Sequence, residues 1–217
     1  MRPFLIATTL ATTLGLLAPL GSAPAQACTY EDTTYSNTGY FLDGPYSTDG
    51  RGENTDGHMW AYLSVASGQP SNQGNVWSGA ADRINTARHS LSSGNWVVTW
   101  HFAAASASLH YTGANVQGVD RLGWQIERFD AQGNVAASDG DSVDVITAPA
   151  QGDNVPFPAG EYAAEIDGGY TYDALFFVNA YGYRPQGSSI DDTISWLGTS
   201  VCWYPGSLPP FLGPHLL

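Results

Sequence analysis

Glu127 and Glu165 are glutamates that could lie on facing strands and take part in catalysis. Each sits in a segment of alternating apolar and polar residues, which indicates a β-strand. Glycoside hydrolysis needs two carboxyl groups about 5–9 Å apart across a cleft. The pair is therefore a candidate for a catalytic site. Glutamates that face water on half-buried strands are the simpler interpretation.

Tyrosines spaced two residues apart form a second candidate site. Tyr170 with Tyr172, and Tyr181 with Tyr183, share one face if their segments are strands. Exposed rings can stack on the CH groups of a sugar, and Arg184 could bond its hydroxyls. The sequence thus favours a carbohydrate-binding surface at these five residues. Cross-strand aromatic packing inside the domain is the alternative.

Carboxylates concentrate between residues 43 and 57, where Asp49, Glu53 and Asp56 are candidate ligands for Ca²⁺. Calcium prefers hard oxygen ligands, and the glycines of this segment would let a loop wrap around the ion. No known calcium-loop register is met, so a solvated acidic turn is the alternative. The run 139–144 resembles only the start of an EF-hand loop, because no glutamate stands at the twelfth position.

Two histidines suggest a further metal site. His101 and His110 would be diagonal neighbours if their strands paired through a short turn. A third ligand is not indicated, so histidines with ordinary hydrogen bonds are the simpler interpretation.

The charge of the chain disfavours several classes of partner. The formal net charge is −13, and all seven basic residues are arginines. Such an acidic chain repels phosphate backbones and anionic lipids, so we expect no binding to nucleic acid or to a membrane surface. Without lysine, the chain has no P-loop lysine and no Schiff-base lysine.

The first 27 residues have the pattern of an export signal. Arg2 precedes a mostly apolar stretch over residues 4–20, and Ala25-Gln26-Ala27 offers a small-x-small cleavage site. We therefore expect a secreted chain that starts at Cys28. Nothing after Cys28 approaches the roughly 20 apolar residues of a membrane span.

Cys28 and Cys202 are the two cysteines of the chain. In an exported protein an even pair predicts one disulfide. A lipid anchor on Cys28 is the alternative, but Ala25 is not the aliphatic residue that normally stands three positions before a lipidated cysteine. A secreted protein is therefore favoured over a periplasmic or lipid-anchored one.

Successive strand patterns separated by turns predict an all-β fold, either an antiparallel β-sandwich or a jelly roll. Segment 95–102 carries the strongest pattern, with large apolar residues at every second position. Segments 122–129 and 134–138 form a predicted hairpin with Gly133 in the left-handed conformation. Other predicted strands are 38–42, 58–66, 106–112, 142–147, 160–167, 173–183 and 193–203.

Two segments are predicted not to be strands. Apolar residues at 80, 84, 87 and 91 have helical spacing, so 80–91 is predicted as the one short helix. A long polar loop is expected after the strand at 38–42, because Asp-Gly turn signals follow it.

Residues 28–204 are predicted to form one domain, followed by a proline-rich tail over 205–217. The leading hypothesis is a non-catalytic extracellular module that binds a glycan or another cell-surface ligand. An extracellular polysaccharide hydrolase is one alternative, and a protein-binding inhibitor or structural coat protein is another. A cleft with facing carboxylates would favour the hydrolase, and a protruding rigid loop would favour the protein partner.

Overall fold

The computed structural model describes residues 27–33, 38–43, 49–55, 58–65, 76–184 and 187–208. For residues 38–43, 49–55, 65, 76–80 and 184 the description covers the backbone only. Within these residues no helix is long and apolar enough to cross a membrane.

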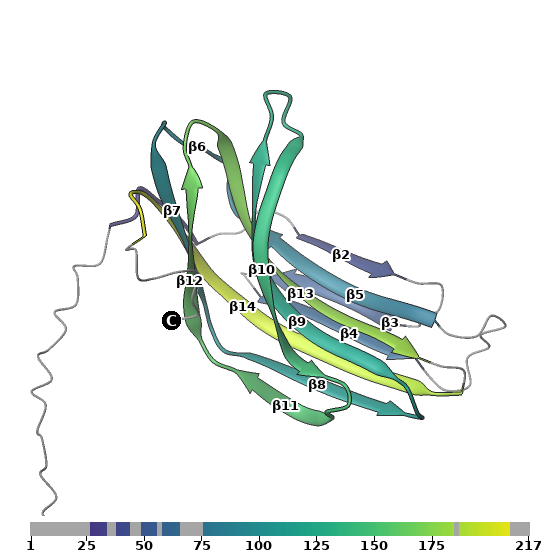
Figure 1. Cartoon of the computed structure of the whole chain (residues 1–217). Coiled ribbons are helices and arrows are strands. Elements are labelled where there is room, and N and C mark those ends of the chain that lie inside the picture. The colour runs from purple at the N-terminus through teal and green to yellow at the C-terminus, as the bar shows by residue number, and fades with distance from the viewer. Residues whose placement is uncertain are drawn as a thin grey trace, which may run out of the picture.

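The described chain folds into two antiparallel sheets that pack face to face (Figure 1). The larger has eight strands: β1 (Tyr30–Asp32), β3 (Asp49–Thr55), β4 (His58–Val65), β7 (Asn95–Phe102), β8 (Ala105–Thr112), β11 (Gly152–Phe157), β12 (Gly160–Asp167) and β14 (Ser189–Pro205). The smaller has six: β2 (Thr38–Asp43), β5 (Val76–Asn85), β6 (His89–Ser90), β9 (Gln117–Phe129), β10 (Val135–Thr147) and β13 (Thr171–Arg184). The predicted all-β antiparallel sandwich is confirmed.

β14 is the central strand of the larger sheet and changes its partners halfway along. Its first part, up to Leu197, pairs with β4 and β8, whereas Gly198 and the residues after it pair with β7. The ladder with β7 is interrupted between Gly198 and Ser200. A Cβ atom on Gly198 would lie 2.6 Å from the ring of Phe176 in the other sheet, so glycine allows the sheets to approach at this point.

Aromatic side chains fill the space between the sheets. Phe102 lies parallel to Trp124 at 6.0 Å between ring centroids and meets Trp196 edge to face at 5.2 Å. Phe176 meets the same Trp196 edge to face at 5.2 Å. These contacts join β7, β9, β13 and β14, and the edge-to-face geometry adds to the free energy gained from burial alone.

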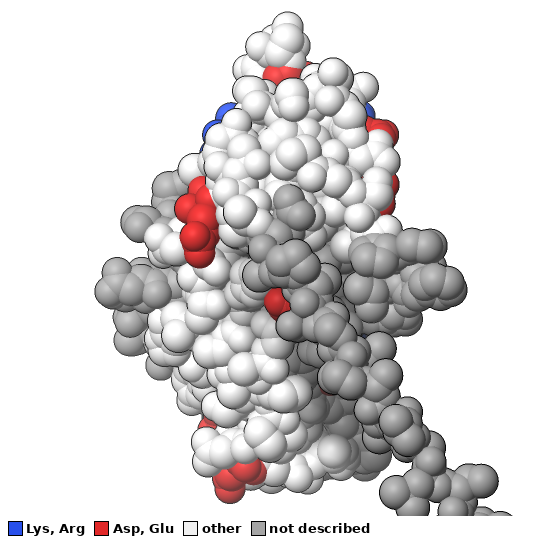
Figure 2. All heavy atoms as spheres, turned by 90° about the vertical axis from the view of Figure 1, so that its left-hand side faces the viewer, with Lys and Arg blue, Asp and Glu red and all other residues white. Residues whose placement is uncertain are grey.

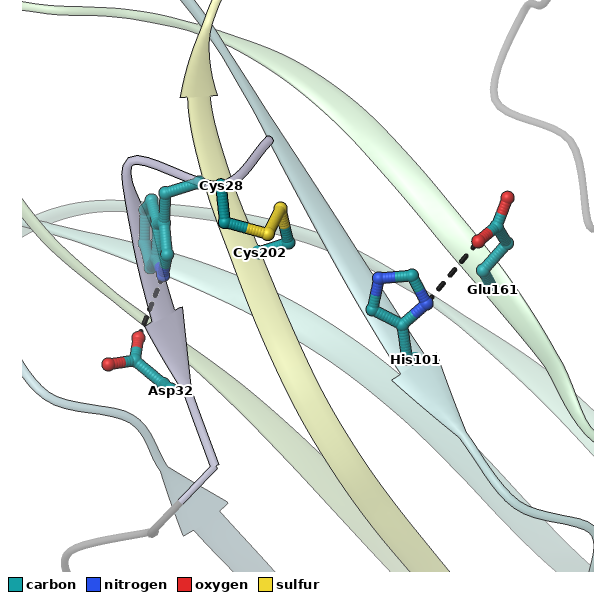
Figure 3. The surroundings of a disulfide bond; sticks show 6 residues. Cys28, Asp32, His101, Glu161 and Cys202 are labelled. Carbon is teal, nitrogen blue, oxygen red and sulfur yellow. Dashed lines mark hydrogen bonds and ion pairs between the residues drawn. A yellow bond between two sulfur atoms is a disulfide. The ribbon is translucent and has the colours of Figure 1, made fainter. Parts of the chain in front are cut away.

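The predicted disulfide between Cys28 and Cys202 is confirmed and ties the N-terminal strand β1 to β14 (Figure 3). A buried polar cluster reinforces it. The indole N–H of Trp203 donates to the carboxylate of Asp32 at 2.8 Å, and His89 Nε2 lies 2.9 Å from the same carboxylate. Tyr30 stacks on the His89 ring at 4.3 Å. β1 is therefore held by covalent, polar and aromatic contacts together.

The helix predicted over 80–91 is wrong. Residues up to Asn85 belong to β5, which pairs with both β2 and β13. Ala80 and Ile84 are four residues apart, a spacing that suits one helical face and one strand face equally, so pairing with neighbouring strands decided the outcome. Ala87 lies outside the strand and is exposed, unlike a core residue of a helix.

The polar loop predicted after residue 42 is also wrong in part, because Asp49–Thr55 form β3, paired with β4. β3 has no alternating apolar residues, so its sequence did not indicate a strand. The short strands β1 and β11 were not predicted, whereas the hairpin with Gly133 at a φ of +83° is confirmed. Residues 142–147 are not a separate strand but continue β10.

Carboxyl groups are buried between the sheets at the end where β9 begins. Asp120 on β9 and Asp192 on β14 interact across the sandwich, and both are fully buried. Burial raises the pKa of Asp120, and the charge of Asp192 raises it further. Burial also raises the pKa of Asp192 and brings that of Asp82 on β5 to about 7. The folded protein therefore keeps protons that the unfolded chain releases above about pH 4.

Stability is expected to fall as pH rises from about 4 to about 7, because these raised pKa values mean that the folded state binds more protons over that range. Asp192→Asn removes one such carboxyl group. The free energy of unfolding should then fall less steeply with pH, by about 1.4 kcal/mol per pH unit for each proton no longer bound. Denaturant unfolding at the two ends of the range measures this. The exposed Asp153→Asn variant is the control, and an unchanged slope in Asp192→Asn would contradict the assignment.

Loss of the disulfide is expected to destabilise the domain strongly. The bond closes a loop with a sequence separation of 174 residues, which corresponds to about 5 kcal/mol in the chain-entropy model. The double variant Cys28→Ala, Cys202→Ala avoids a free thiol, and its free energy of unfolding can be compared with that of the reduced wild type. Stability equal to that of the oxidised protein would show that the polar cluster alone holds β1.

Candidate functional site

A cleft of about 470 Å³ opens between the edge strands β10 and β12. β10 pairs only with β9, and β12 pairs only with β7 among the described strands, so one wall comes from each sheet. The two strands form the near edge of the sandwich in Figure 1. Residues of β7, β9, β10, β12 and β13 line the cleft, whose volume is typical of small-molecule sites.

Aromatic rings form the floor of the cleft. Tyr162 on β12 packs against Trp124 on β9, with 4.4 Å between ring centroids, and against Trp100 on β7 at 5.8 Å. Tyr172 on β13 also lines the cleft, and its hydroxyl donates to the backbone carbonyl of Asp167 at 2.8 Å. All four rings are at least nine-tenths buried, so the floor is rigid and largely apolar.

The indole N–H groups divide the buried tryptophans into two sets. Trp96, Trp196 and Trp203 each donate a hydrogen bond to a protein oxygen. The indole nitrogens of Trp100 and Trp124 are buried and have no acceptor at hydrogen-bonding geometry within the described part of the chain. The Trp124 indole nevertheless interacts with the Tyr162 hydroxyl and lowers its pKa. These two tryptophans therefore line the cleft with their rings, not with exposed donors.

The alternation of each strand explains which residues reach the cleft. On β12, Tyr162, Ala164 and Ile166 line it from one face of the strand, and Glu165 and Asp167 line it near the end of the strand. On β9 the cleft residues are Trp124, Ile126 and Arg128. Asp139 and Asp141 on β10 lie opposite Ile126 and Trp124, and so share their sheet face.

Charged groups surround the floor. Burial raises the pKa of Tyr162, and the carboxylates of Asp141 and Asp139 raise it further, while the Trp124 indole opposes the shift. Burial also raises the pKa of Tyr172. Arg128 lies 4.6 Å from the centre of the Tyr170 ring. The cleft thus combines an aromatic floor with charged side chains around it, namely Asp139, Glu165, Asp167 and Arg128.

The structure separates the tyrosines that the sequence grouped. Tyr172 lines the cleft, and Tyr170 stands 47% exposed beside it, under Arg128. Tyr181 and Tyr183 are half-buried near the opposite end of β13, opposite Val119 and Gln117 of β9, and do not line the cleft. The side chain of Arg184 lies outside the described residues.

The structure does not bring Glu127 and Glu165 together. Glu127 lies on the face of β9 that points away from the cleft, directly opposite Asp173, and 3.9 Å from Arg83. Glu165 accepts hydrogen bonds from the Asn95 side chain at 2.7 Å and from the backbone N–H of Leu208 at 3.0 Å. Glu127 is thus part of an ion-pair network, and Glu165 anchors the chain after β14.

The side chains of the predicted calcium ligands Asp49, Glu53 and Asp56 lie outside the described residues. Elsewhere in the described chain, no group of three or more potential metal ligands is present. The run 139–144 is part of β10 and cannot wrap around an ion as an EF-hand loop does.

The two histidines are not neighbours, because β7 and β8 both pair with β14 and not with each other. His101 instead faces Glu161 at 3.3 Å (Figure 3), and His110 faces Asp153 at 2.8 Å.

Sequence reasoning missed the cleft, although it noticed several of its residues. Trp100 belongs to the strand predicted over 95–102 and Trp124 to that over 122–129, but nothing in the sequence shows that two edge strands leave their rings at the base of an opening. Asp139 and Asp141 were compared only with the start of an EF-hand loop. Their spacing of two residues was the available signal, because it places both carboxylates on one face of a strand.

Gly140→Ala is expected to disturb the β10 wall. A Cβ atom at this position would collide with the backbone carbonyl of Trp124 and lie 2.8 Å from Gln125 Cα, so β10 would have to move away from β9. A loss of about 1–3 kcal/mol in the free energy of unfolding is expected. Gly152→Ala, which would meet only the tip of the Val155 side chain, is the matched control. Equal stability of the two variants would show that the wall tolerates the shift.

No protein-family model and no curated protein sequence matches the chain. Solved structures similar to it include the enzymatically active domain of tailspike protein 4 of bacteriophage CBA120, with a TM-score of 0.31 and 14% identity over 79% of this chain. This chain covers 20% of that tailspike chain. Another is TmCBM61 in complex with β-1,4-galactotriose, with a TM-score of 0.30, 8% identity, and coverage of 77% of this chain and 88% of that one. Both TM-scores are low, so the function is argued from the cleft itself.

Proposed function

We propose that the protein is an extracellular, non-catalytic module that binds a glycan in the cleft between β10 and β12. The observation that carries this proposal is a cleft that has a floor of four aromatic rings and polar side chains on both walls. A sugar offers contacts to both. Its CH groups pack on aromatic rings, and its hydroxyls form hydrogen bonds with polar side chains such as Ser138, Asp139 and Arg128.

Export supports an extracellular setting for this function. The N-terminal signal pattern and the Cys28–Cys202 disulfide fit an oxidising compartment. The surface in Figure 2 is mostly uncharged, with acidic atoms in a few groups and few basic atoms. Such a surface suits an uncharged or cationic ligand better than an anionic one.

The arrangement of carboxyl groups favours binding over hydrolysis. A glycosidase needs two carboxyl groups on either side of the scissile bond. Here Glu127 faces away from the cleft. Asp139 and Glu165 line its two walls, but the Glu165 carboxylate accepts hydrogen bonds from Asn95 and from the backbone of Leu208, which hold it in place. We therefore place the module among binders and assay hydrolysis in the same experiment.

Filling the cleft should abolish binding while leaving the fold intact. Ala164 lines the cleft, whereas its neighbour Ala163 faces the other side of β12, opposite Thr99. Ala164→Arg is expected to weaken binding at least about tenfold, because the long side chain occupies the ligand's volume, while Ala163→Arg retains it. Pull-down on a panel of insoluble polysaccharides measures this, with released reducing ends assayed in the same tubes.

Each outcome of the pull-down has a distinct meaning. Loss of binding in Ala164→Arg alone supports the cleft. Loss in Tyr181→Ala or Tyr183→Ala, with Ala164→Arg unaffected, would move the site to the outer face of β13. Release of reducing ends would make the protein a hydrolase, and no binding to any polysaccharide would overturn the glycan-binding function.

A further inference from the structure

One end of the cleft adjoins an exposed aromatic ring. Tyr170 is 47% exposed, and within the described part of the chain only Val135 is a comparably exposed large hydrophobic residue. Tyr170 is not among the residues that line the cleft, but it contacts two that are. Its ring meets that of Tyr172 edge to face at 6.3 Å between centroids, and the Arg128 guanidinium lies 4.6 Å from its centre. Tyr170 can therefore extend the surface on which a ligand packs.

The register of β13 against β9 shows in which direction this aromatic surface extends. Phe176 is opposite Trp124 and Tyr172 is opposite Arg128, so Tyr172 lies at the end of the cleft away from Trp124. Tyr170 precedes Tyr172 in the chain and lies beyond that end. At about 3.3 Å per residue, the surface from Trp124 to Tyr170 is about 20 Å long, which is several times the width of one sugar ring.

The turn that carries Tyr170 is firmly held. The backbone carbonyl of Tyr170 accepts a hydrogen bond from the N–H of Leu91 at 2.9 Å, and the N–H of Gly169 donates to the carbonyl of Leu91 at 3.0 Å. Gly168 is packed so closely that a Cβ atom there would collide with the carbonyl of Ser92. A ring on such a turn is oriented before a ligand arrives, so binding loses little conformational entropy at this point.

Arg128 supplies hydrogen-bond donors between the cleft and Tyr170. It lines the cleft, lies over the Tyr170 ring and interacts with the Tyr172 hydroxyl, which uses only part of its donor capacity. It has no carboxylate partner among the described residues. The other described arginine side chains each pair with a carboxylate: Arg83 with Glu127, Arg88 with Asp173, and Arg121 with Asp144. A guanidinium held by aromatic rings is a rigid donor for sugar hydroxyls.

Resting on the glycan-binding function above, we propose that Tyr170 and Arg128 form an outer subsite, so that the protein binds an extended stretch of a neutral polysaccharide chain and not a single terminal sugar. The chain packs along the floor of the cleft, receives hydrogen bonds from Arg128 and packs on the Tyr170 ring. Affinity should therefore rise with chain length until the chain reaches Tyr170. The net charge of −13 disfavours a polyanionic chain.

The test is isothermal titration of the oxidised protein with neutral oligosaccharides of increasing length. The probes are the disaccharides and hexasaccharides of the cello-, manno- and xylo-oligosaccharide series. The hexasaccharide of the recognised series should bind at least about tenfold more tightly than its disaccharide, because only the longer chain reaches Tyr170. Tyr170→Ala should remove most of this difference by weakening hexasaccharide binding, and it should leave disaccharide binding unchanged.

Two control variants separate the subsite from a purely structural role of Tyr170. Tyr170→Phe keeps the ring on which the sugar packs and should retain the tight binding of the hexasaccharide. Val135→Ala removes the other exposed large hydrophobic side chain, which lies outside the cleft, and should also retain it. A residue that merely supports the cleft through Arg128 would affect short and long oligosaccharides alike, so the difference between the two lengths is the decisive readout.

The outcomes distinguish this inference from the proposed function. Equal affinity for disaccharide and hexasaccharide, blocked by Ala164→Arg, would overturn the outer subsite and leave the glycan-binding function standing. Equal weakening of both lengths in Tyr170→Ala, or no weakening of either, would also overturn the subsite. Retention on an insoluble polysaccharide without binding of any soluble oligosaccharide would overturn the recognition of a single extended chain. No binding of any oligosaccharide, with none in the pull-down, would overturn both proposals.

Discussion

The change of partners along β14 at Gly198 is the constraint on which the rest of the structure depends. Before this residue β14 pairs with β4 and β8, and after it with β7 and then β1. β12 is attached only through β7, so the position of one cleft wall is set by where β14 makes this change. The close approach of Phe176 to Gly198 fixes the distance between the sheets at the same point. Strand pairing in one sheet and packing between sheets therefore cannot vary independently here.

The two walls of the cleft are built differently from its floor. The floor consists of rings from β7, β9, β12 and β13 that are nine-tenths or more buried, with many neighbours to hold their rotamers. Each wall is an edge strand with a single partner, and most of β10 is exposed on both faces. The free energy of local unfolding is lowest in elements with few buried contacts. The cleft therefore has a rigid aromatic floor between walls whose displacement costs less free energy.

The sequence was sufficient to predict the elements whose residue pattern fits only one kind of structure. The strand over 95–102 was predictable because its apolar residues alternate, and the Cys28–Cys202 disulfide was predictable from the export-signal pattern and the even number of cysteines. The strand over residues 80–85 was not predictable, because apolar residues four positions apart share one face in a helix and in a strand alike. Pairing with β13 and β2 decides that this segment is a strand. The cleft was beyond local patterning. It exists because β10 and β12, which are separated in the chain only by β11, lie at the edges of different sheets on the same side of the sandwich, which is a property of topology.

The disulfide has a mechanical consequence. Cys28 and Cys202 lie 5.3 Å apart between their Cα atoms, and every residue of the cleft falls between them in the chain. A force applied to the chain outside these two positions passes through the covalent bond and does not unzip the sheets. If the module is tethered while it holds a ligand on an insoluble surface, tension in the tether reaches the binding site only through the ligand itself.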